Sequence, residues 1–416
     1  MCANHHAESK SFWQSTPFIY AVMIALGLYS GFSDIALLKT SGLFIADVFI
    51  RIFKCISLPI IALSIIVTLA KYCPGGIMQR VWRRVMCYTL GTTLIAGFIS
   101  FFLYLLIKPG VVSMPAEAAT DAVATGGTSY LGHLSHLIPE NFFSPFIEGQ
   151  VLSVLFLSII IGSAIRAIPD EEARKTITHF FSGAHGMLMV ITRWIIRIIP
   201  IGLYGFITTS VVQMRSGADF SGIGQYLLII VLSNLVQGFI ILPLWLKYEG
   251  IKPYQTMRRM FPALSLAFFT KSSVGTLPVT IDTMEQKLKV KPELSRFVLP
   301  LCTSINMNGC AAFIFTTVVY LMQNHGITLT LPMMALWVVI ATVAAIGNAG
   351  IPMGCFFLSA SLLASMNVPI TLMGIILPFY SLIDMLETSL NVWSDACVTK
   401  VVDTHVKDAA VIEVEA

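Results

Sequence analysis

The chain has 416 residues, of which 56% are hydrophobic and only 12% are charged, and its mean hydropathy is +0.81. This composition excludes an ordinary soluble domain and indicates a polytopic membrane protein. The net charge of +4 comes from short basic clusters between apolar segments rather than from one continuous patch, so no nucleic-acid partner is expected.

Apolar segments long enough to cross a lipid bilayer predict eight transmembrane helices. Basic residues follow the second, fourth and sixth of these segments, which predicts that those loops and both termini are cytoplasmic. We therefore expect a multi-pass protein of the plasma membrane, which in a bacterium is the inner membrane. The predicted spans lie at about residues 17–38, 43–70, 85–107, 141–166, 186–212, 224–246, 297–323 and 371–398.

Two further apolar segments are interrupted in the middle by small residues and proline. The first covers about residues 260–284, with its interruption at 271–278, and the second covers about residues 331–368, with its interruption at 347–354. Irregular backbone is tolerated at membrane depth only where protein or a watery cavity receives it. We predict two re-entrant helical hairpins whose tips meet at an internal cavity; two helices with a glycine kink are the alternative. Each hairpin precedes a full span, as in an inverted repeat.

The seventh predicted span is interrupted by Ser304, Asn306, Asn308, Gly309 and Cys310. A glycine flanked by amides and a hydroxyl can unwind a helix and turn its carbonyls toward an ion. Hard cations such as Na⁺ are expected to prefer these oxygen ligands. Contacts between packed helices are the alternative interpretation, but the clustering favours a cation site.

Three carboxylates, Asp384, Glu387 and Asp395, share the last predicted span and fall on one helical stripe with Thr388 and Asn391. An acidic side chain at the centre of a bilayer costs roughly 2.5 to 3.5 kcal/mol on insertion scales. Three of them require cations, protons or a bound solute nearby. Hydrogen bonding between helices is the alternative, but three acids on one face favour an ion or solute pathway.

Sequence motifs of zinc sites and of catalytic sites are missing. The eight cysteines and the histidines do not have the spacing of a zinc site, and the spans contain no nucleophile and base pair. Neither an organic cofactor nor enzymatic activity is expected.

From the first span to Lys400, the chain resembles the dicarboxylate/amino acid:cation symporters, the family of glutamate and neutral amino-acid transporters. Residues 271–278 and 349–352 resemble the tips of the two hairpins in that family. Residues 306–309 resemble the break in its seventh span, and 384–395 resemble its last span, most closely that of bacterial sodium/serine-threonine symporters. The resemblance implies an all-α polytopic membrane protein with eight transmembrane helices and two re-entrant hairpins, an inverted-repeat, elevator-type transporter, assembled as a homotrimer.

The resemblance also implies a fixed scaffold and a mobile transport unit. The scaffold comprises helices 1 and 2 at 17–70 and helices 4 and 5 at 141–212. The transport unit comprises helix 3 at 85–107 and residues 224–398, with helix 6, both hairpins and helices 7 and 8. Residues 1–16 and 399–416 are the cytoplasmic tails.

The resemblance assigns roles to individual residues. Asp384 is expected to pair with the ammonium of an amino-acid substrate, while Asn391 and Thr388 help to hold its α-carboxylate. Cys310 lines the pocket, and the hairpin tips close over it with Ser272, Ser273, Ile351 and Gly354. Co-transported sodium ions are expected at side chains or carbonyls of Thr92, Thr93, Cys302, Ser304, Asn306, Asn308, Ala345, Ile346, Asn348, Asn391 and Asp395.

Departures from the family pattern bear on the substrate. Glu387 stands where carriers of acidic amino acids have an arginine, and it would repel a substrate carboxylate. Cys310 replaces a threonine that is usual in those carriers. We therefore predict a small neutral amino acid such as serine, threonine or alanine, with Glu387 accepting a hydroxyl hydrogen bond. Asn308 replaces a sodium-binding aspartate, which predicts one or two sodium ions per cycle instead of three.

Other functions remain open at this point. Glu387 is a suitable counter-charge for a cationic amino acid, or a protonatable group for proton-coupled transport of amino acids or dicarboxylates. Lys271 balances Asp384 in the empty site or extends toward the cytoplasm. A passive channel is less favoured, because the polar groups converge on one midplane position instead of lining a continuous path.

Overall fold

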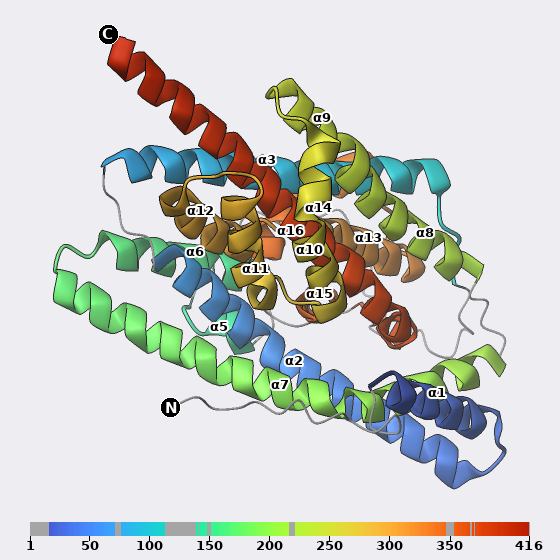
Figure 1. The fold of residues 1–416 in the computed structure, drawn as a ribbon. Helices are drawn as coiled ribbons and strands as arrows, with labels where there is room; N and C mark the ends of the chain where they lie inside the picture. Colours follow the sequence, from blue (N-terminus) through green and yellow to red (C-terminus); the bar gives the residue numbers. More distant parts are fainter. Residues whose placement is uncertain are drawn as a thin grey trace, which may run out of the picture.

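The computed structural model describes residues 16–70, 76–112, 139, 141–147, 151–215, 221–346, 353–366, 368–369 and 371–415. Within these ranges all regular secondary structure is helical, as the predicted fold class requires (Figure 1). The N-terminal half contains α1 (Thr16–Phe32), α2 (Ala36–Ala70), α3 (Gly76–Ile107), α5 (Ser144–Ile147), α6 (Val151–Ala167) and α7 (Glu171–Arg215). The C-terminal half contains α8 (Ser221–Val236), η3 (Gln237–Ile241), α9 (Leu242–Tyr248), α10 (Pro253–Thr270), α11 (Ser273–Gln286), α12 (Pro292–Ile305), α13 (Asn308–Asn324), α14 (Leu331–Ile346), α15 (Gly354–Ser365) and α16 (Thr371–Glu415).

In the described part of the chain, four helical stretches are long and apolar enough to cross a membrane. They are Arg80–Ile107, Gly222–Tyr248, Pro292–Asn324 and Leu372–Val406. A fifth is α7 if its two arms, which meet at 54°, form one bent span. Pro200 explains a bend in this helix, because it has no N–H for the bond to the preceding turn. The predicted spans at 17–38, 43–70 and 141–166 overlap the shorter apolar stretches Ala21–Phe32, Leu58–Ala70 and Ser153–Ala167.

The first predicted loop was placed a few residues too late. The turn between α1 and α2 lies at residues 33–35, and the segment around Lys39 that we expected to be a loop is helical. Ser33 and Asp34 supply the turn chemistry, since the Ser33 hydroxyl accepts from the Ile35 amide at 3.1 Å. Gly42 lies within α2 directly against Thr208 of α7. A Cβ at this position would meet the threonine side chain at 2.5 Å, so the close contact requires glycine.

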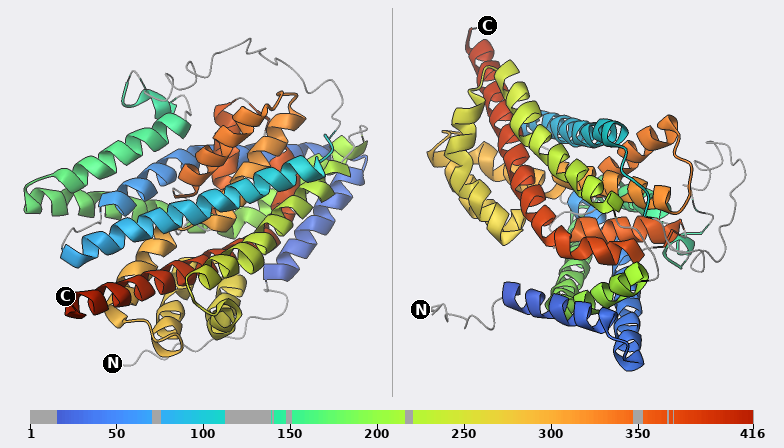
Figure 2. Two further views of the ribbon diagram at one scale, coloured as in Figure 1. Left: turned by 90° about the horizontal axis from the view of Figure 1, so that it is seen from above. Right: turned by 90° about the vertical axis from the view of Figure 1, so that its right-hand side faces the viewer.

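Helices α1, α2 and α7 pack together on one side of the molecule, and α6 packs on α2. The right-hand view in Figure 2 shows α1 projecting below the helices of the C-terminal half, with α2 and α7 running up toward them. The two groups meet mainly where α15 contacts α2 and where α16 contacts α7, and also where α6 contacts α14 and α15 and where α12 contacts α2. At the second contact Gly374 lies against the ring of Phe206.

Helix α13 forms the centre of the second group. Every residue from Asn308 to Met322 is buried, and α3, α8, α14, α15 and α16 all pack around it. Tyr380 of α16 is fully buried between Phe313 of α13 and Phe356 of α15, with ring centroids 4.8 and 5.5 Å away. These aromatic contacts join three helices around the centre of the molecule.

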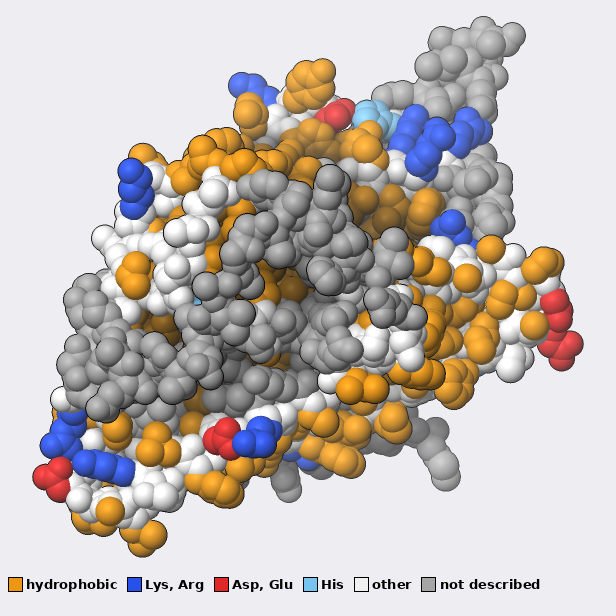
Figure 3. All heavy atoms as spheres, turned by 180° about the vertical axis from the view of Figure 1, so that it is seen from behind, with side chains coloured by type: hydrophobic (Ala, Val, Ile, Leu, Met, Phe, Trp, Pro, Cys, Tyr) orange, Lys and Arg blue, Asp and Glu red, His pale blue; other side chains and the backbone are white. Residues whose placement is uncertain are grey.

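Helix ends that were predicted to share one side of the membrane contact each other. The Gly110 amide donates to Gln225 Oε1 at 2.7 Å, which joins the end of α3 to the start of α8. At the opposite ends, His405 Nε2 lies 2.9 Å from Glu249 Oε2 and its Nδ1 lies 3.0 Å from Tyr88 Oη. In Figure 3 the charged side chains gather near the extremities of the molecule, and much of the described surface between them is hydrophobic.

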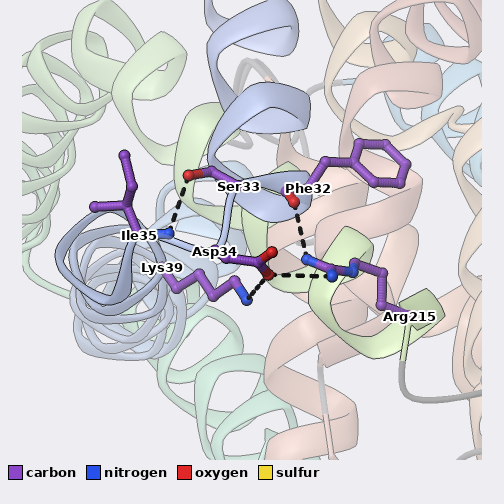
Figure 4. A network of polar contacts seen from close by, with 6 residues as sticks. All are labelled: Phe32, Ser33, Asp34, Ile35, Lys39 and Arg215. Atoms are coloured by element: carbon purple, nitrogen blue, oxygen red, sulfur yellow. Dashed lines mark hydrogen bonds and ion pairs between the residues drawn. The ribbon is translucent and has the colours of Figure 1, made fainter.

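A small ionic network closes the turn between α1 and α2 (Figure 4). Arg215, at the end of α7, donates to the Phe32 carbonyl at 2.9 Å and to Asp34 Oδ1 at 3.2 Å. The hydrogen bond from Arg215, with a smaller contribution from Lys39, holds the pKa of Asp34 below its ordinary value. The network ties the end of α7 to the first turn of the chain, in agreement with the predicted common side for these two loops.

Helices α13 and α16 approach each other closely at Gly309. A Cβ at this position would stand 2.7 Å from Glu387 Cα and 3.0 Å from Asn234 Oδ1. The backbone of α16 cannot move aside easily, because its side chains pack on several neighbouring helices. Glycine is therefore required at this contact.

We expect Gly309→Ala to destabilise the protein by about 1 to 3 kcal/mol, because the added methyl group overpacks this contact. The measurement is the thermal midpoint of the detergent-solubilised protein. Gly183→Ala on α7 is the matched control, since nothing lies within 4 Å of its added Cβ. Equal midpoints for the two variants would contradict the close approach of α13 and α16.

Candidate functional site

In the described part of the C-terminal half, three helical stretches are interrupted close to α16. The breaks separate α10 from α11, α12 from α13 and α14 from α15, whereas α8, η3 and α9 form one continuous helix with a π-helical turn. Figure 1 shows α10, α11, α13 and α15 gathered around the middle of α16, which they contact. Each break leaves amides at a helix N-terminus and carbonyls at a helix C-terminus without partners in the helix. Such ends attract anions and cations respectively.

The predicted break in the seventh span is confirmed. Helix α12 ends at Ile305, α13 begins at Asn308, and Asn306 and Met307 leave the helical conformation. Helix α14 has 16 residues and α15 has 12, or about 24 and 18 Å. Both are shorter than a bilayer core of about 30 Å. In the first predicted hairpin, α10 and α11 fold back on each other around Lys271, which is left-handed at φ 54°.

Asp395 lies in a fully buried polar cluster on the α12 side of α16 and is 1% exposed. Asn306 Nδ2 donates to Asp395 Oδ1 at 2.9 Å, and Thr303 Oγ1 donates to Oδ2 at 3.3 Å. Thr92 of α3 reaches the same cluster by donating to Asn306 Oδ1 at 3.2 Å. Carboxylate, amide and hydroxyl oxygens from three helices therefore converge, and this is the ligand chemistry of a hard cation.

Asn308 connects this cluster to two further residues. Its Nδ2 donates to Asn306 Oδ1 at 2.8 Å and to Ser394 Oγ at 2.9 Å. Its Oδ1 accepts from Gln237 Nε2 at 2.6 Å. The amide nitrogen of Asn308 thus occupies acceptors that a cation would otherwise use.

Gln237 was not recognised from the sequence. It begins the π-helical turn η3 and also donates to the Thr92 carbonyl at 3.1 Å. The wide turn is stabilised from α16, since Trp393 Nε1 donates to the Gly238 carbonyl at 3.0 Å. A π-helical turn within an α-helix often accompanies a functional site. The available signal was the polar pair Asn234 and Gln237 in an otherwise apolar segment.

Glu387 lies two turns before Asp395 on α16 and is also 1% exposed. Neither oxygen of its carboxylate has a nitrogen or oxygen partner among the described residues. Its neighbours are the thiols of Cys310 and Cys355, and one ligand atom from each of the three residues lies within 4.8 Å of the other two. Cys355, in the second hairpin, was not recognised from the sequence.

Two helix N-termini lie beside Glu387, Cys310 and Cys355, a group of side chains that we call the Glu387 chamber. Cys310 lies in the first turn of α13 and Cys355 in the first turn of α15. The Gly309 amide at the start of α13 donates to Asn391 Oδ1 at 2.9 Å, and Asn391 Nδ2 lies 3.5 Å from Cys310 Sγ. The positive ends of the two helix dipoles compensate in part for the buried carboxylate. Gly354, the first residue of α15, contributes an amide to the same N-terminus.

The other predicted substrate residues lie elsewhere on α16 and at the tip of the first hairpin. Asp384 is half-buried one turn before Glu387, and Thr388 is buried beside it. At the tip of the first hairpin, Ser272 caps α11 by accepting from the Gly275 amide at 3.0 Å, and Ser273 follows it. Lys271 Nζ donates to Ser381 Oγ, one turn from Asp384, so the side chain of this lysine contacts α16.

The remaining predicted sodium ligands are divided between three places. The Cys302 carbonyl accepts from the Asn306 amide at 2.7 Å, and Ser304 Oγ turns back to the Pro300 carbonyl. Thr93 Oγ1 is buried without a partner in the described chain. Ala345 and Ile346 are the last two residues of α14. Asn348 and Ile351 lie outside the described residues.

Several known amino-acid transporters are similar to this chain in sequence. Human neutral amino acid transporter B(0) is 27% identical over 389 residues, which cover 85% of this chain and 71% of the relative. A putative sodium-dependent excitatory amino acid transporter, glt-4 of Caenorhabditis elegans, is 27% identical over 416 residues, which cover 88% of this chain and 83% of the relative. Human neutral amino acid transporter A is 23% identical over 423 residues, which cover 91% of this chain and 79% of the relative.

These relatives are transporters and not enzymes, which confirms the prediction that the chain is not an enzyme. The model of the sodium:dicarboxylate symporter family matches residues 18–405, nearly the whole chain. With its broken helices and the buried acids of α16, the chain belongs to the sodium:dicarboxylate symporter family.

Proposed function

We propose that this protein imports a small neutral amino acid of the serine, threonine or alanine kind together with sodium ions. The observation that carries the proposal is the buried Glu387 carboxylate, which faces two helix N-termini and has no nitrogen or oxygen partner among the described residues. A hydroxyl or ammonium donor from a solute supplies that partner. A second carboxylate would be repelled, so glutamate and aspartate are poor substrates. The two human relatives are named neutral amino acid transporters, which supports this substrate class.

The backbone groups of the amino acid have partners of suitable charge. Asp384 pairs with the substrate ammonium, and Thr388 and Asn391 hold the α-carboxylate. The amides at the starts of α11 and α15, near Ser272, Ser273, Ile351 and Gly354, stabilise the same carboxylate through their helix dipoles. Cys310 and Cys355 leave a small, weakly polar space for the side chain. A small side chain with or without a hydroxyl fits this space.

Sodium binds in the Asp395 cluster and at the C-terminal end of α14. The first site uses Asp395 and Asn391 with carbonyls near Cys302 and Asn306; the second uses carbonyls near Ser304, Ala345, Ile346 and Asn348. A third site at Thr92, Thr93 and Asn308 is weak, because the Asn308 amide nitrogen already bonds the available oxygens. We therefore expect one or two sodium ions per cycle.

Transport follows an elevator-type alternating-access mechanism in a homotrimer. The proposal is supported by the separate packing of α1, α2, α6 and α7 from the other helices, which limits the contacts between the two groups. The first group corresponds to the scaffold at 17–70 and 141–212, and the second to the transport unit at 85–107 and 224–398. Both termini face the cytoplasm, and the membrane is the plasma membrane, which in a bacterium is the inner membrane.

Uptake into proteoliposomes tests the proposal directly. An inward sodium gradient should drive accumulation of labelled serine above its external concentration, and replacing sodium with choline should abolish accumulation. Equilibration without accumulation under the gradient would indicate a passive channel and contradict the proposal.

Glu387→Arg tests the substrate pocket. The guanidinium should lower serine affinity at least about tenfold, because it removes the acceptor, and it should permit competition by aspartate through a bidentate ion pair. The measurement is competition for serine uptake. Glu293→Arg, at an exposed position near the start of α12, is the matched control and should behave as wild type. Unchanged specificity in Glu387→Arg would show that this side chain does not face the solute.

Asp395→Asn tests the ion site. Loss of the buried charge should raise the sodium concentration for half-maximal uptake by about tenfold or more, while the order of preference among amino acids is retained. Sodium titration of uptake gives this value. The control is Asp282→Asn, an exposed carboxylate on α11. A changed substrate order with normal sodium dependence would place Asp395 in the solute site instead.

One observation favours a second candidate, a carrier of cationic amino acids. Asp384 and Glu387 are successive acidic residues on one face of α16, and the nearby Lys271 donates to Ser381. A lysine, arginine or ornithine side chain would neutralise Glu387 directly. Strong inhibition of uptake by arginine, with none by serine, would establish this candidate in place of the neutral substrate.

A further inference from the structure

The chamber around Glu387 contains chemistry that binding of a neutral amino acid does not require. Cys310 and Cys355 come from different helices, and the carboxylate comes from a third. One ligand atom from each lies within 4.8 Å of the other two. Met307 adds a thioether, whose Sδ lies 3.9 Å from Cys310 Sγ. Soft sulfur atoms are therefore concentrated in one buried place.

We propose that Cys310, Cys355 and Glu387 form a binding site for a thiophilic divalent cation of the zinc class. In a tetrahedral zinc site, bonds of about 2.3 Å to sulfur and 2.0 to 2.2 Å to oxygen place two sulfur ligands and one oxygen ligand about 3.5 to 3.8 Å apart. A contraction of about 1 Å from the observed limit of 4.8 Å closes the site. Side-chain rotation and a small movement of α15 provide such a contraction.

The surroundings of the site favour a bound cation. Glu387 is 1% exposed, and its carboxylate lacks a nitrogen or oxygen partner in the described chain. Both cysteines lie in the first turn of a helix, whose dipole favours negative charge, and binding of the cation releases their thiol protons to solvent. Asn391 Nδ2, 3.5 Å from Cys310 Sγ, orients that sulfur from outside the ligand set.

The ligand types also determine which cations are excluded. Sodium, magnesium and calcium prefer oxygen, whereas thiolates select zinc and cadmium. Three protein ligands leave the fourth position of a tetrahedral cation open to water or to a donor group of a solute. This arrangement is typical of exchangeable sites, in contrast to structural sites with four protein ligands.

Occupancy would have a mechanical consequence. The ligands connect the second hairpin through α15 to α13 and α16, so a bound cation fixes α15 across the chamber. This consequence rests on the proposed function, because a fixed hairpin and an occupied pocket would stop uptake. The binding of the cation itself does not depend on which solute is carried.

Cadmium titration of the full-length protein in detergent, under a reductant without thiols, tests the site. A background in which Cys2, Cys55, Cys73 and Cys87 are replaced with serine retains the four buried cysteines, Cys302, Cys310, Cys355 and Cys397. We expect one equivalent of CdCl₂ to produce thiolate-to-cadmium charge-transfer absorption in the ultraviolet, and MgCl₂ to produce none. Cys310→Ser and Cys355→Ser should each abolish the band. Glu387→Gln should weaken binding about tenfold or more.

Cys397→Ser is the matched control, because Cys397 is equally buried on α16 but lies outside the three-residue group. It should retain the full absorption. A band that survives Cys310→Ser and Cys355→Ser, or that is lost in Cys397→Ser, would overturn the proposal. If a cysteine variant does not fold, the unsubstituted protein still tests the metal site. ZnCl₂ should raise the thermal midpoint of that protein, and a chelator should reverse the rise. An unchanged midpoint would overturn the proposed site.

Uptake measurements separate this inference from the proposed function. ZnCl₂ should inhibit sodium-driven serine uptake in the background protein, and Cys355→Ser should relieve the inhibition at least about tenfold. Absence of serine uptake under every condition would refute the proposed function, while the cadmium absorption would still decide the metal site. Undiminished inhibition in Cys355→Ser would show that zinc acts elsewhere and would overturn the proposed block.

Discussion

Two carboxylates buried in the middle of an apolar helical body are the constraint that the rest of the structure accommodates. Asp395 and Glu387 are each 1% exposed, and regular helices could not offer them backbone donors, because every amide in a helix interior is already bonded. The breaks between α12 and α13 and between α14 and α15 supply two helix N-termini at that depth. Asn306 and Thr303 then satisfy Asp395. Glu387 remains available for a ligand.

The same constraint explains the packing of the centre. Bringing α13 close enough to serve α16 requires Gly309, whose missing side chain lets the two backbones meet. Asn391 then bonds the Gly309 amide, so the start of α13 is held by the helix that it supports. Tyr380, between Phe313 and Phe356, fills the remaining space between three helices. The same few residues therefore supply hydrogen bonds to buried polar groups and close packing between the helices.

The sequence predicts the structural role of residues that have an intrinsic backbone preference. It does not predict the role of residues that act through contacts with distant parts of the chain. The break at Asn306, the turn at Lys271 and the acidic face of α16 follow from local composition, and all three occur in the structure. Gln237 was missed because a π-helical turn has no local signature, and its role depends on Thr92 and Asn308, far away in the chain. Cys355 was missed because its importance arises only when α15 is placed against α13 and Glu387.

Asn391 lies between the two carboxylates of α16, one turn from each. It contacts the start of α13 and the thiol of Cys310, and the Asp395 cluster begins one turn further along. A single amide thus borders both the Asp395 cluster and the Glu387 chamber, whose carboxylates lie about 12 Å apart along the helix. In the proposed function these are the ion site and the solute site, so the orientation of Asn391 bears on both binding free energies together. By linkage, the factor by which sodium tightens amino-acid binding must equal the factor by which the amino acid tightens sodium binding.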